Sequence, residues 1–468
     1  MKRNLIQSFI DGVKDKNTGE RYSTILSYFY PEFITNFLIY SLPIFVDAYF
    51  IGSISTTAYA AAGVTTTLIH YFVKFAEAFS VATVILTGQL NGSDDRHGAG
   101  KVLTTAFWVS CCVGMIVGFF LYVGAPLIYA LYGVPSDMVP LGISYLQLRA
   151  IGLFLMFIYQ ACIGFLRGVK NTKIPMITFV AGTISFIVFD YLLIFGGWVF
   201  PAMGIAGSAM ASIIQYAVAT CCILIYLLAG PYTRPYAIRL FSDLRDLRLI
   251  KKILSLSWPV ILDKAAIPLS YIWLIKILNP MGTNVVAAFC VVRNMEQFAF
   301  LPALAFAQVI TFLVSNDIGA GDWSGVKSNI KKVLFAAMCM MSVILILFTL
   351  WPRSIIQLFD RENNFTAFAA HVFPMVSIFI FCDLFQVILA GALRGAANVK
   401  IVLIVRMAVL LGYFVPISYF LAQLQLPDDI KFILIYSSFY LGNAIMSCGY
   451  WYHFRSNRWK KYAGVSDD

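Results

Sequence analysis

Two acidic residues inside long hydrophobic segments are the first candidates for chemistry in this chain. Asp47 follows Pro43 by four residues in the first segment, and Asp190 lies in the fifth. An Asp at the centre of a membrane helix costs about 2.5 kcal/mol or more, so such a residue is retained for a reason. Two acids at one depth form a pair that can hold a proton or Na⁺. Pro43 adds a bend point and frees the carbonyl of Ile39 as a ligand oxygen.

The other ionisable residues within hydrophobic segments nearly balance in charge, which predicts that many of them pair. His70, Lys74 and Glu77 share one helix face, where Lys74 and Glu77 form an ion pair or the stripe serves as a proton relay or substrate wall. Asp383 lies near the middle of the tenth segment and is a third candidate for cation coupling. Further candidates for a substrate cavity or relay are Asp263, Lys264, Arg293 and Glu296, with Tyr40, Tyr159 and Tyr191 as rings that could stack on a flat cation.

Composition places these residues in an integral membrane protein. The 468 residues are 60% hydrophobic and 12% charged, with a mean hydropathy of +0.81. A soluble domain carries about 25% charged residues, so this chain has about half the usual share. The formal net charge of +11 therefore has to be read by position, and it is poor evidence for a nucleic-acid partner.

The chain contains twelve mostly apolar runs, each long enough to cross about 30 Å of hydrocarbon as a helix. We expect spans near 27–51, 58–88, 102–128, 140–165, 174–197, 203–229, 253–278, 285–315, 333–352, 368–392, 400–422 and 430–454. With the N-terminus inside, the inner connections hold 25 Lys and Arg and the outer ones hold 3. This bias predicts that both termini are cytoplasmic.

The predicted domain organisation has two lobes of six spans. We expect an N-terminal cytoplasmic segment at 1–26, an N-lobe at 27–229, a C-lobe at 253–454 and a cytoplasmic tail at 455–468. The connection 230–252 holds six basic residues and two acidic ones, and we expect it to lie on the cytoplasmic surface as an amphipathic linker.

The two halves repeat at a shift of 227 residues. This shift superimposes Gly92-x-x-Asp95-x-x-Gly98 on Gly319-x-x-Asp322-x-x-Gly325. It also superimposes Gly164, Leu166, Arg167, Gly168, Asn171 and Lys173 on Gly391, Leu393, Arg394, Gly395, Asn398 and Lys400. Six spans per repeat leave both halves in the same orientation, related by an axis along the membrane normal, which is an architecture of secondary transporters.

These motifs resemble the multidrug and toxic compound extrusion (MATE) family of the MOP flippase superfamily. The resemblance rests on Leu42-Pro43-x-x-x-Asp47-x-x-x-x-Gly52, on the two pairs of repeated loops, and on Asp190-Tyr191-Leu192-Leu193-Ile194-Phe195-Gly196 with Met203-Gly204-Ile205-Ala206-Gly207-Ser208-Ala209. It covers nearly the whole chain. It implies an all-α exporter of twelve helices in two lobes, which moves organic cations, drugs or related amphiphiles outward by rocker-switch alternating access, in exchange for H⁺ or Na⁺. In many members of this family an acid at the position of Asp47, and in some members an acid at that of Asp190, belongs to an N-lobe cation site, so the resemblance implies a site for H⁺ or Na⁺ at these residues and no other metal ion.

Two other function classes compete with this interpretation. A flippase of a lipid-linked precursor would need a basic cavity, to which Lys74, Lys264 and Arg293 could contribute, although flippases of this superfamily often have fourteen spans. An intramembrane enzyme or ATP-driven pump is disfavoured, because the chain has no phosphate-binding loop motif and only four His residues. We therefore expect no enzyme activity and no cofactor beyond the coupling ion. The expected setting is a bacterial inner membrane, where the protein works as a monomer on a small amphiphilic or cationic substrate.

Overall fold

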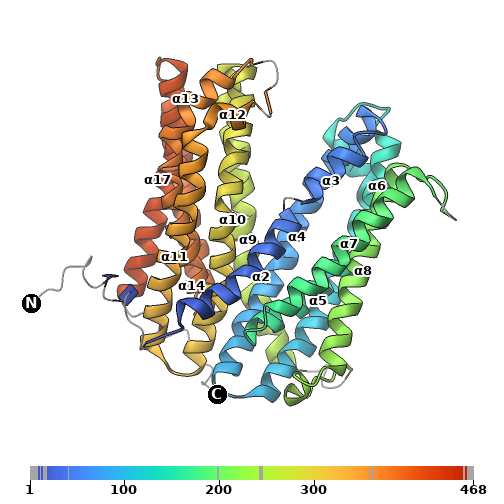
Figure 1. Ribbon diagram of the computed structural model, residues 1–468, viewed down its shortest axis with the longest axis vertical. Helices are drawn as coiled ribbons and strands as arrows, with labels where there is room; N and C mark the ends of the chain where they lie inside the picture. Colours follow the sequence, from blue (N-terminus) through green and yellow to red (C-terminus); the bar gives the residue numbers. More distant parts are fainter. Residues whose placement is uncertain are drawn as a thin grey trace, which may run out of the picture. The chain divides into compact units, whose positions relative to one another are not determined.

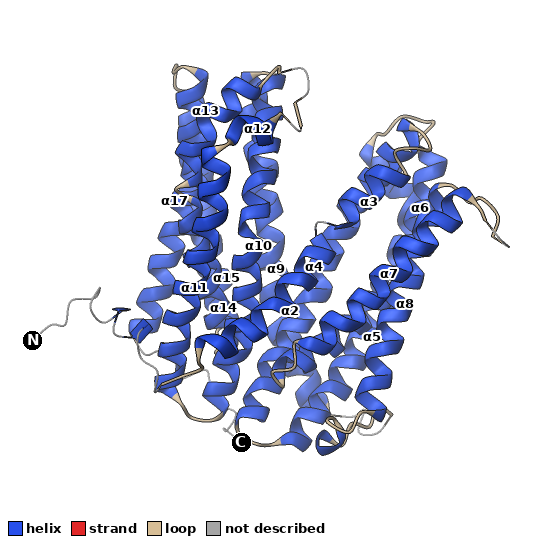
Figure 2. Ribbon diagram, in the orientation of Figure 1, coloured by secondary structure: helices blue, strands red, loops and turns tan. Residues whose placement is uncertain are grey.

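The computed structural model describes residues 9–10, 12–13, 18–40, 42–197, 200–241, 246–357, 359–360, 363–456 and 459–460. The side chains at positions 43, 44, 47 and 48 lie outside this description. Nearly all the described residues are helical (Figures 1 and 2), and within these ranges the β-structure is limited to one isolated bridge between Gly197 and Phe200.

The predicted spans of the N-terminal half correspond to seven helices. The first predicted span covers α2 and α3, between which position 41 lies outside the described residues, and each of the other five is a single helix. In chain order the helices are α2 (Tyr22–Tyr40), α3 (Leu42–Phe50), α4 (Thr56–Gly92), α5 (Arg96–Tyr132), α6 (Val139–Gly168), α7 (Lys173–Phe195) and α8 (Ile205–Ala229).

The C-terminal half has the other six predicted spans and one short extra helix. After the 3₁₀ turn η1 (Arg234–Tyr236), helix α9 begins inside the predicted linker at 230–252. The elements are α9 (Leu247–Leu278), η2 (Asn279–Met281), α10 (Thr283–Gly319), α11 (Trp323–Leu350), α12 (Pro352–Ile356), α13 (Thr366–Ser377), α14 (Ile380–Gly395), α15 (Val399–Val409), η3 (Leu410–Phe414), α16 (Val415–Gln423) and α17 (Asp428–Arg455).

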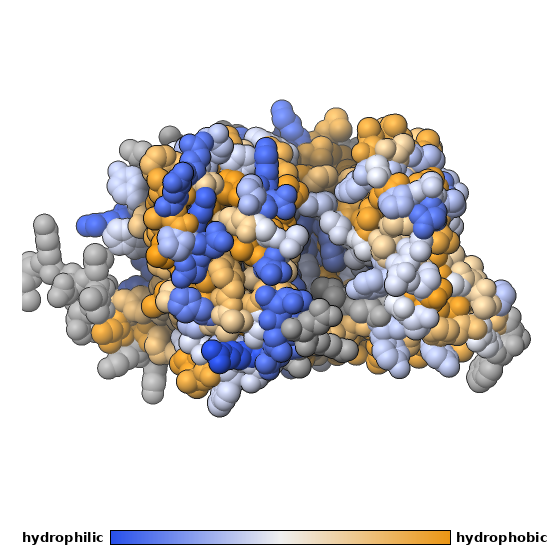
Figure 3. Space-filling view, turned by 90° about the horizontal axis from the view of Figure 1, so that it is seen from above, coloured by the Kyte–Doolittle hydropathy of each residue, from blue (hydrophilic) through white to orange (hydrophobic). Residues whose placement is uncertain are grey.

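Among the described residues, nine helical spans are long and apolar enough to cross a membrane, and a bent pair would make a tenth. The remaining two predicted spans lie on α2 with α3 and on α9. Figure 3 looks onto the helix ends near α12 and shows hydrophilic residues gathered there beside apolar ones.

The chain forms two compact units, which we call the N-terminal unit (Tyr30–Ile261) and the C-terminal unit (Met1–Phe29 with Leu262–Asp468). Helices α2 and α9 each run from one unit into the other. The segment before α2 is bound to the C-terminal unit, because the Lys332 ammonium donates to the carbonyls of Thr18 at 2.7 Å and Glu20 at 3.0 Å. The amide of Glu20 also donates to Asn329 Oδ1 at 2.8 Å.

The repeated loops have the same local structure in both halves. The carboxylates of Asp95 and Asp322 cap α5 and α11 by accepting hydrogen bonds from the amides of Gly98 at 2.8 Å and Gly325 at 2.9 Å. A Cβ at either glycine would lie 2.3 Å from the capping carboxylate, so any larger residue there would have to displace the cap. In the second pair of loops, Lys170 and Ala397 both adopt the left-handed conformation, with φ of 60° and 59°. These details confirm the internal repeat at the level of hydrogen bonds.

Two spans of the C-terminal unit depart from the continuous helices predicted for them. The tenth span bends by 48° between α13 and α14. Pro374 in α13 has no amide hydrogen to donate. At the break, the backbone hydrogen bonds from Phe379 N to Val376 O (3.0 Å) and from Cys382 N to Phe379 O (2.9 Å) each join residues three positions apart. The break places Asp383 in the first turn of α14. The eleventh span contains the π-helical turn η3.

Candidate functional site

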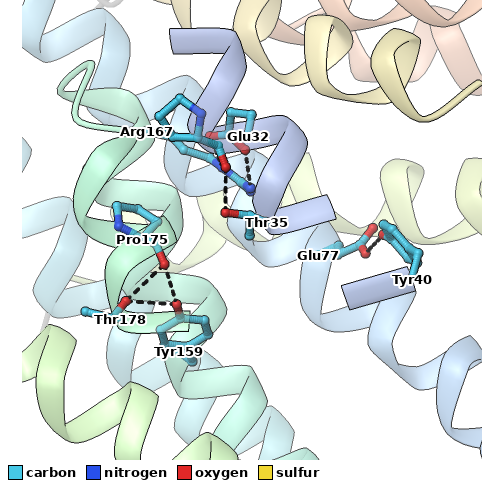
Figure 4. Close-up of polar contacts among 9 residues, drawn as sticks. Glu32, Thr35, Tyr40, Glu77, Tyr159, Arg167, Pro175 and Thr178 are labelled. Atoms are coloured by element: carbon cyan, nitrogen blue, oxygen red, sulfur yellow. Dashed lines mark hydrogen bonds and ion pairs between the residues drawn. The ribbon is translucent and has the colours of Figure 1, made fainter. Parts of the chain in front are cut away.

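The predicted stripe on α4 forms a cluster with the last residue of α2, which we call the Lys74 cluster. Lys74 Nζ lies 3.2 Å from Glu77 Oε1, 2.5 Å from the Tyr40 hydroxyl oxygen and 4.0 Å from the centre of the Tyr40 ring. The Tyr40 hydroxyl donates to the Glu77 carboxylate (Figure 4). The predicted ion pair between Lys74 and Glu77 is therefore confirmed, and half-buried His70 lies one turn away on the same helix.

A second ion pair in the N-terminal unit joins α2 to the end of α6. Arg167 Nε lies 2.7 Å from Glu32 Oε1, and Arg167 Nη2 lies 2.6 Å from Oε2, so the contact is bidentate (Figure 4). The side chains are 10% and 2% exposed. Buried bidentate pairs fix geometry as well as charge, and this one holds the end of α6 against α2.

The C-terminal unit has the corresponding contact with one additional arginine. Arg394, the repeat counterpart of Arg167, donates to Asp263 at 2.5 Å, and Arg406 donates to the other oxygen of the same carboxylate. Asp263 is on α9, the first helix of its half, as Glu32 is on α2. Its side chain is 1% exposed. Asp263 therefore does not line a substrate cavity as expected, because two guanidinium groups enclose its carboxylate.

Residues of α9, α10 and α17 form a further cluster, which we call the Arg293 cluster. The hydroxyls of Tyr436 and Tyr440 both donate to Glu296 Oε2, the second over 2.6 Å. The guanidinium of Arg293 lies 4.1 Å from the centre of the Tyr271 ring. Glu296 is 4% exposed, and among the described residues its Oε1 atom has no hydrogen-bond partner. The charge of half-buried Asp383 is close enough to interact with those of Glu296 and Arg406.

The predicted pair of Asp47 and Asp190 can be placed only in part. Asp190 on α7 is completely buried. Asp47 and Pro43 are on α3, and their side chains lie outside the described residues. Helices α3 and α7 pack against each other, and the Phe50 ring lies 6.0 Å from that of Tyr191. The helices that carry the two acids are thus neighbours, and the pairing itself stays a prediction.

Three further predicted residues differ in their surroundings. Tyr159 is a core residue and not a cavity residue, because it is 1% exposed and its hydroxyl donates to the carbonyl of Pro175 at 3.0 Å (Figure 4). Tyr191 is exposed, and Lys264 is half-buried. Arg149, another basic residue within the predicted spans, donates to the Ser212 hydroxyl.

A recess of about 560 Å³ lies in the C-terminal unit, away from all the predicted residues. It is formed where α11 ends and α12 and α13 begin, and its lining includes Trp351, Arg353 and His371. Among the described residues, no group of three or more His, Cys, Asp or Glu side chains could hold a metal ion.

Comparison with known proteins gives the class of this chain. A family model described as MatE matches residues 31–192 and again residues 259–420, once in each half. The chain belongs to the MatE family and is a MATE transporter, a multi-pass membrane protein.

The curated relatives and solved structures agree with this assignment. The chain is 23% identical to the probable multidrug resistance protein YoeA of Bacillus subtilis over 76% of this chain and 77% of the relative. It is also 23% identical to the probable multidrug resistance protein NorM of Mannheimia succiniciproducens over 81% and 82%.

A crystal structure of MATE in the bent conformation matches with a TM-score of 0.85 at 19% identity, covering 94% of this chain and 96% of that chain. The structure of a MOP superfamily transporter from Pyrococcus furiosus, whose binding pocket is described as having reverse polarity, also matches. Its TM-score is 0.85 at 17% identity, and the match again covers 94% of this chain and 96% of that chain. The predicted fold of twelve transmembrane helices in two six-helix lobes is confirmed.

Proposed function

We propose that this protein is a secondary active exporter that moves organic cations, drugs or other amphiphilic compounds outward in exchange for H⁺ or Na⁺. The observation that carries the proposal is Glu296, a carboxylate buried within a membrane helix whose Oε1 has no hydrogen-bond partner among the described residues. A buried carboxylate with one oxygen that accepts no hydrogen bond is suited to accept a proton or a small cation in one conformation of the transporter and to release it in another. The names of the curated relatives, multidrug resistance proteins, support the export of drugs.

Asp47, Asp190 and Asp383 are the proposed coupling residues, and Glu296 is the proposed proton relay of the C-terminal unit. Asp190 is completely buried on α7, next to the helix that carries Asp47. Asp383 lies in the first turn of α14, where the positive end of the helix dipole favours a negative charge. Binding of the cation to these acids would favour one conformation and binding of the substrate the other, so that each expels the other by a rocker-switch movement. In this proposal both termini are cytoplasmic, the membrane is a bacterial inner membrane, and the monomer is the working unit without enzyme activity.

The test is efflux of a fluorescent amphiphilic dye from proteoliposomes in which a pH gradient and a Na⁺ gradient are imposed separately. We expect one gradient to drive transport and Asp47→Asn to abolish it. The matched control is Asp94→Asn, which removes an exposed loop acid that pairs with Arg96 at 3.0 Å. The proposal fails if Asp47→Asn and Asp94→Asn both transport at the wild-type rate.

Lys74 and Arg293 also favour a second candidate, a flippase of a lipid-linked precursor, because they place basic groups within the spans. That function predicts translocation of a phosphate-bearing lipid in the same vesicles without an imposed ion gradient.

A further inference from the structure

The Lys74 and Arg293 clusters contain the same kinds of residue, a cation, a glutamate and tyrosines, although they lie in different halves of the chain. In each, a basic residue precedes a glutamate by three positions on the helix of the second predicted span of its half, α4 or α10. Each cation lies over a tyrosine ring from the first helix of its own half, at 4.0 Å for Lys74 on Tyr40 and 4.1 Å for Arg293 on Tyr271.

Both glutamates accept hydrogen bonds from tyrosine hydroxyls, Glu77 from Tyr40 and Glu296 from Tyr436 and Tyr440. The shift of 227 residues would carry Lys74 to Leu301 and not to Arg293. The two clusters are therefore separate instances of one arrangement and do not follow from the residue-by-residue repeat.

This arrangement is the one by which proteins hold an organic cation. A positive group over an aromatic face gains about 2 kcal/mol when desolvated, and a carboxylate alongside adds a charge-assisted contact. Here the chain's own cation fills that position in each unit. A permanently cationic ligand would have to displace Lys74 or Arg293 from its tyrosine ring within the membrane, where an uncompensated Lys or Arg costs about 2.5–3.5 kcal/mol.

The exposure of the side chains shows which charge a ligand would meet. The Lys74 side chain is 30% exposed and that of Glu77 is 11%. Arg293 is half-buried, whereas Glu296 is 4% exposed. In both units the cation is more exposed than the glutamate three residues further on. If the cation turns toward a ligand, the glutamate keeps the hydrogen bonds that it accepts from tyrosine hydroxyls. The cation can therefore bind an anionic group of the ligand without leaving the buried glutamate without hydrogen bonds.

We infer that Lys74 and Arg293 determine the charge selectivity of transport. They act as tethered cations that exclude permanent monocations and bind an acidic group, so the preferred substrates are amphiphiles that carry a carboxylate or a phosphate, alone or as zwitterions. This inference rests on the proposed transport function and narrows its substrate class.

The test uses two dyes on one ring system in proteoliposomes. Tetramethylrhodamine has a free carboxylate and is a zwitterion, and its methyl ester is a permanent monocation. We expect the wild type to transport the acid in preference to the ester, and we expect Lys74→Gln and Arg293→Gln each to reduce the acid-to-ester ratio about tenfold, the effect of about 1.4 kcal/mol. The conservative Lys74→Arg keeps the cation and should keep the ratio.

The matched control is Lys276→Gln, which removes an exposed span lysine that also lies over an aromatic ring, 5.5 Å from the Trp273 ring centre. Unchanged acid-to-ester ratios in both Lys74→Gln and Arg293→Gln would overturn the inference.

A second readout, the affinity of each dye for the detergent-solubilised protein by fluorescence anisotropy, separates the two proposals. If the affinity ratio shifts in the variants while vesicles show no gradient-driven transport, the exchange function fails and the selectivity assignment stands. If transport is gradient-driven and neither ratio shifts, the exchange function stands and the assignment fails.

Discussion

Asp263→Asn should destabilise the C-terminal unit strongly, because it leaves two buried guanidinium groups without their carboxylate. Arg394 and Arg406 are 12% and 7% exposed, and both donate to Asp263. Asparagine keeps the size of the side chain but removes the negative charge and one acceptor oxygen. Removal of one partner from a buried ion pair costs about 3–5 kcal/mol. At about 2–4 °C per kcal/mol for a unit of this size, Tm should fall by about 6–20 °C.

The assay is thermal unfolding of the purified protein in detergent, followed by the loss of the monodisperse peak in size-exclusion chromatography. Asp95→Asn is the control, because asparagine caps a helix as well as aspartate does. Combining Asp263→Asn with Arg406→Met should raise Tm above that of Asp263→Asn alone, since it removes one of the two uncompensated charges. A Tm of Asp263→Asn equal to that of Asp95→Asn, or no recovery in the double variant, would refute the reasoning.

Three further changes test the packing and the caps with the same thermal assay. Gly164→Ala should cost about 1–3 kcal/mol through overpacking, because its Cβ would lie 2.6 Å from the Ser80 carbonyl oxygen, whereas Gly63→Ala, with open space around it, should be neutral or stabilising. Glu32→Gln should lower Tm by an amount close to that of Asp263→Asn, since it removes the carboxylate charge that faces the buried Arg167 guanidinium. Hydrogen bonds from the Ser324 hydroxyl and the Gly325 amide lower the pKa of Asp322, so its capping contribution should be complete above the ordinary Asp pKa of about 4 and should disappear as the pH falls through the lowered value. In a pH series Asp322→Ala should therefore be less stable than the wild type at neutral pH, and the difference should vanish in strong acid.

Hydrophobic runs and loop residues were enough to predict the helices and their repeat. The twelve predicted runs fall on the observed helices, and the shift of 227 residues anticipated the matching caps at Asp95 and Asp322. These features are local, because an apolar run must be helical in a membrane and a capping carboxylate must lie three residues before its amide.

The partners of the charged residues could not be read from the sequence in the same way. Arg167 and Glu32 are 135 residues apart, and Arg406 and Asp263 are 143 apart. Near-balance of charge predicted that pairs exist, and the repeated Leu-Arg-Gly motif was a signal that both arginines have equivalent roles. Only the packing of the helices shows which acid each arginine meets. The break after α13 was similarly marked by Pro374 in the sequence, but the bend it produces depends on the neighbouring helices.

The most direct test of the proposed exchange is transport in proteoliposomes with the pH gradient and the Na⁺ gradient applied one at a time. The account predicts that one of the two gradients drives accumulation of an amphiphilic dye against its own concentration gradient, and that Asp47→Asn abolishes this accumulation. Equal dye movement with either gradient, with neither, and in Asp47→Asn would contradict it.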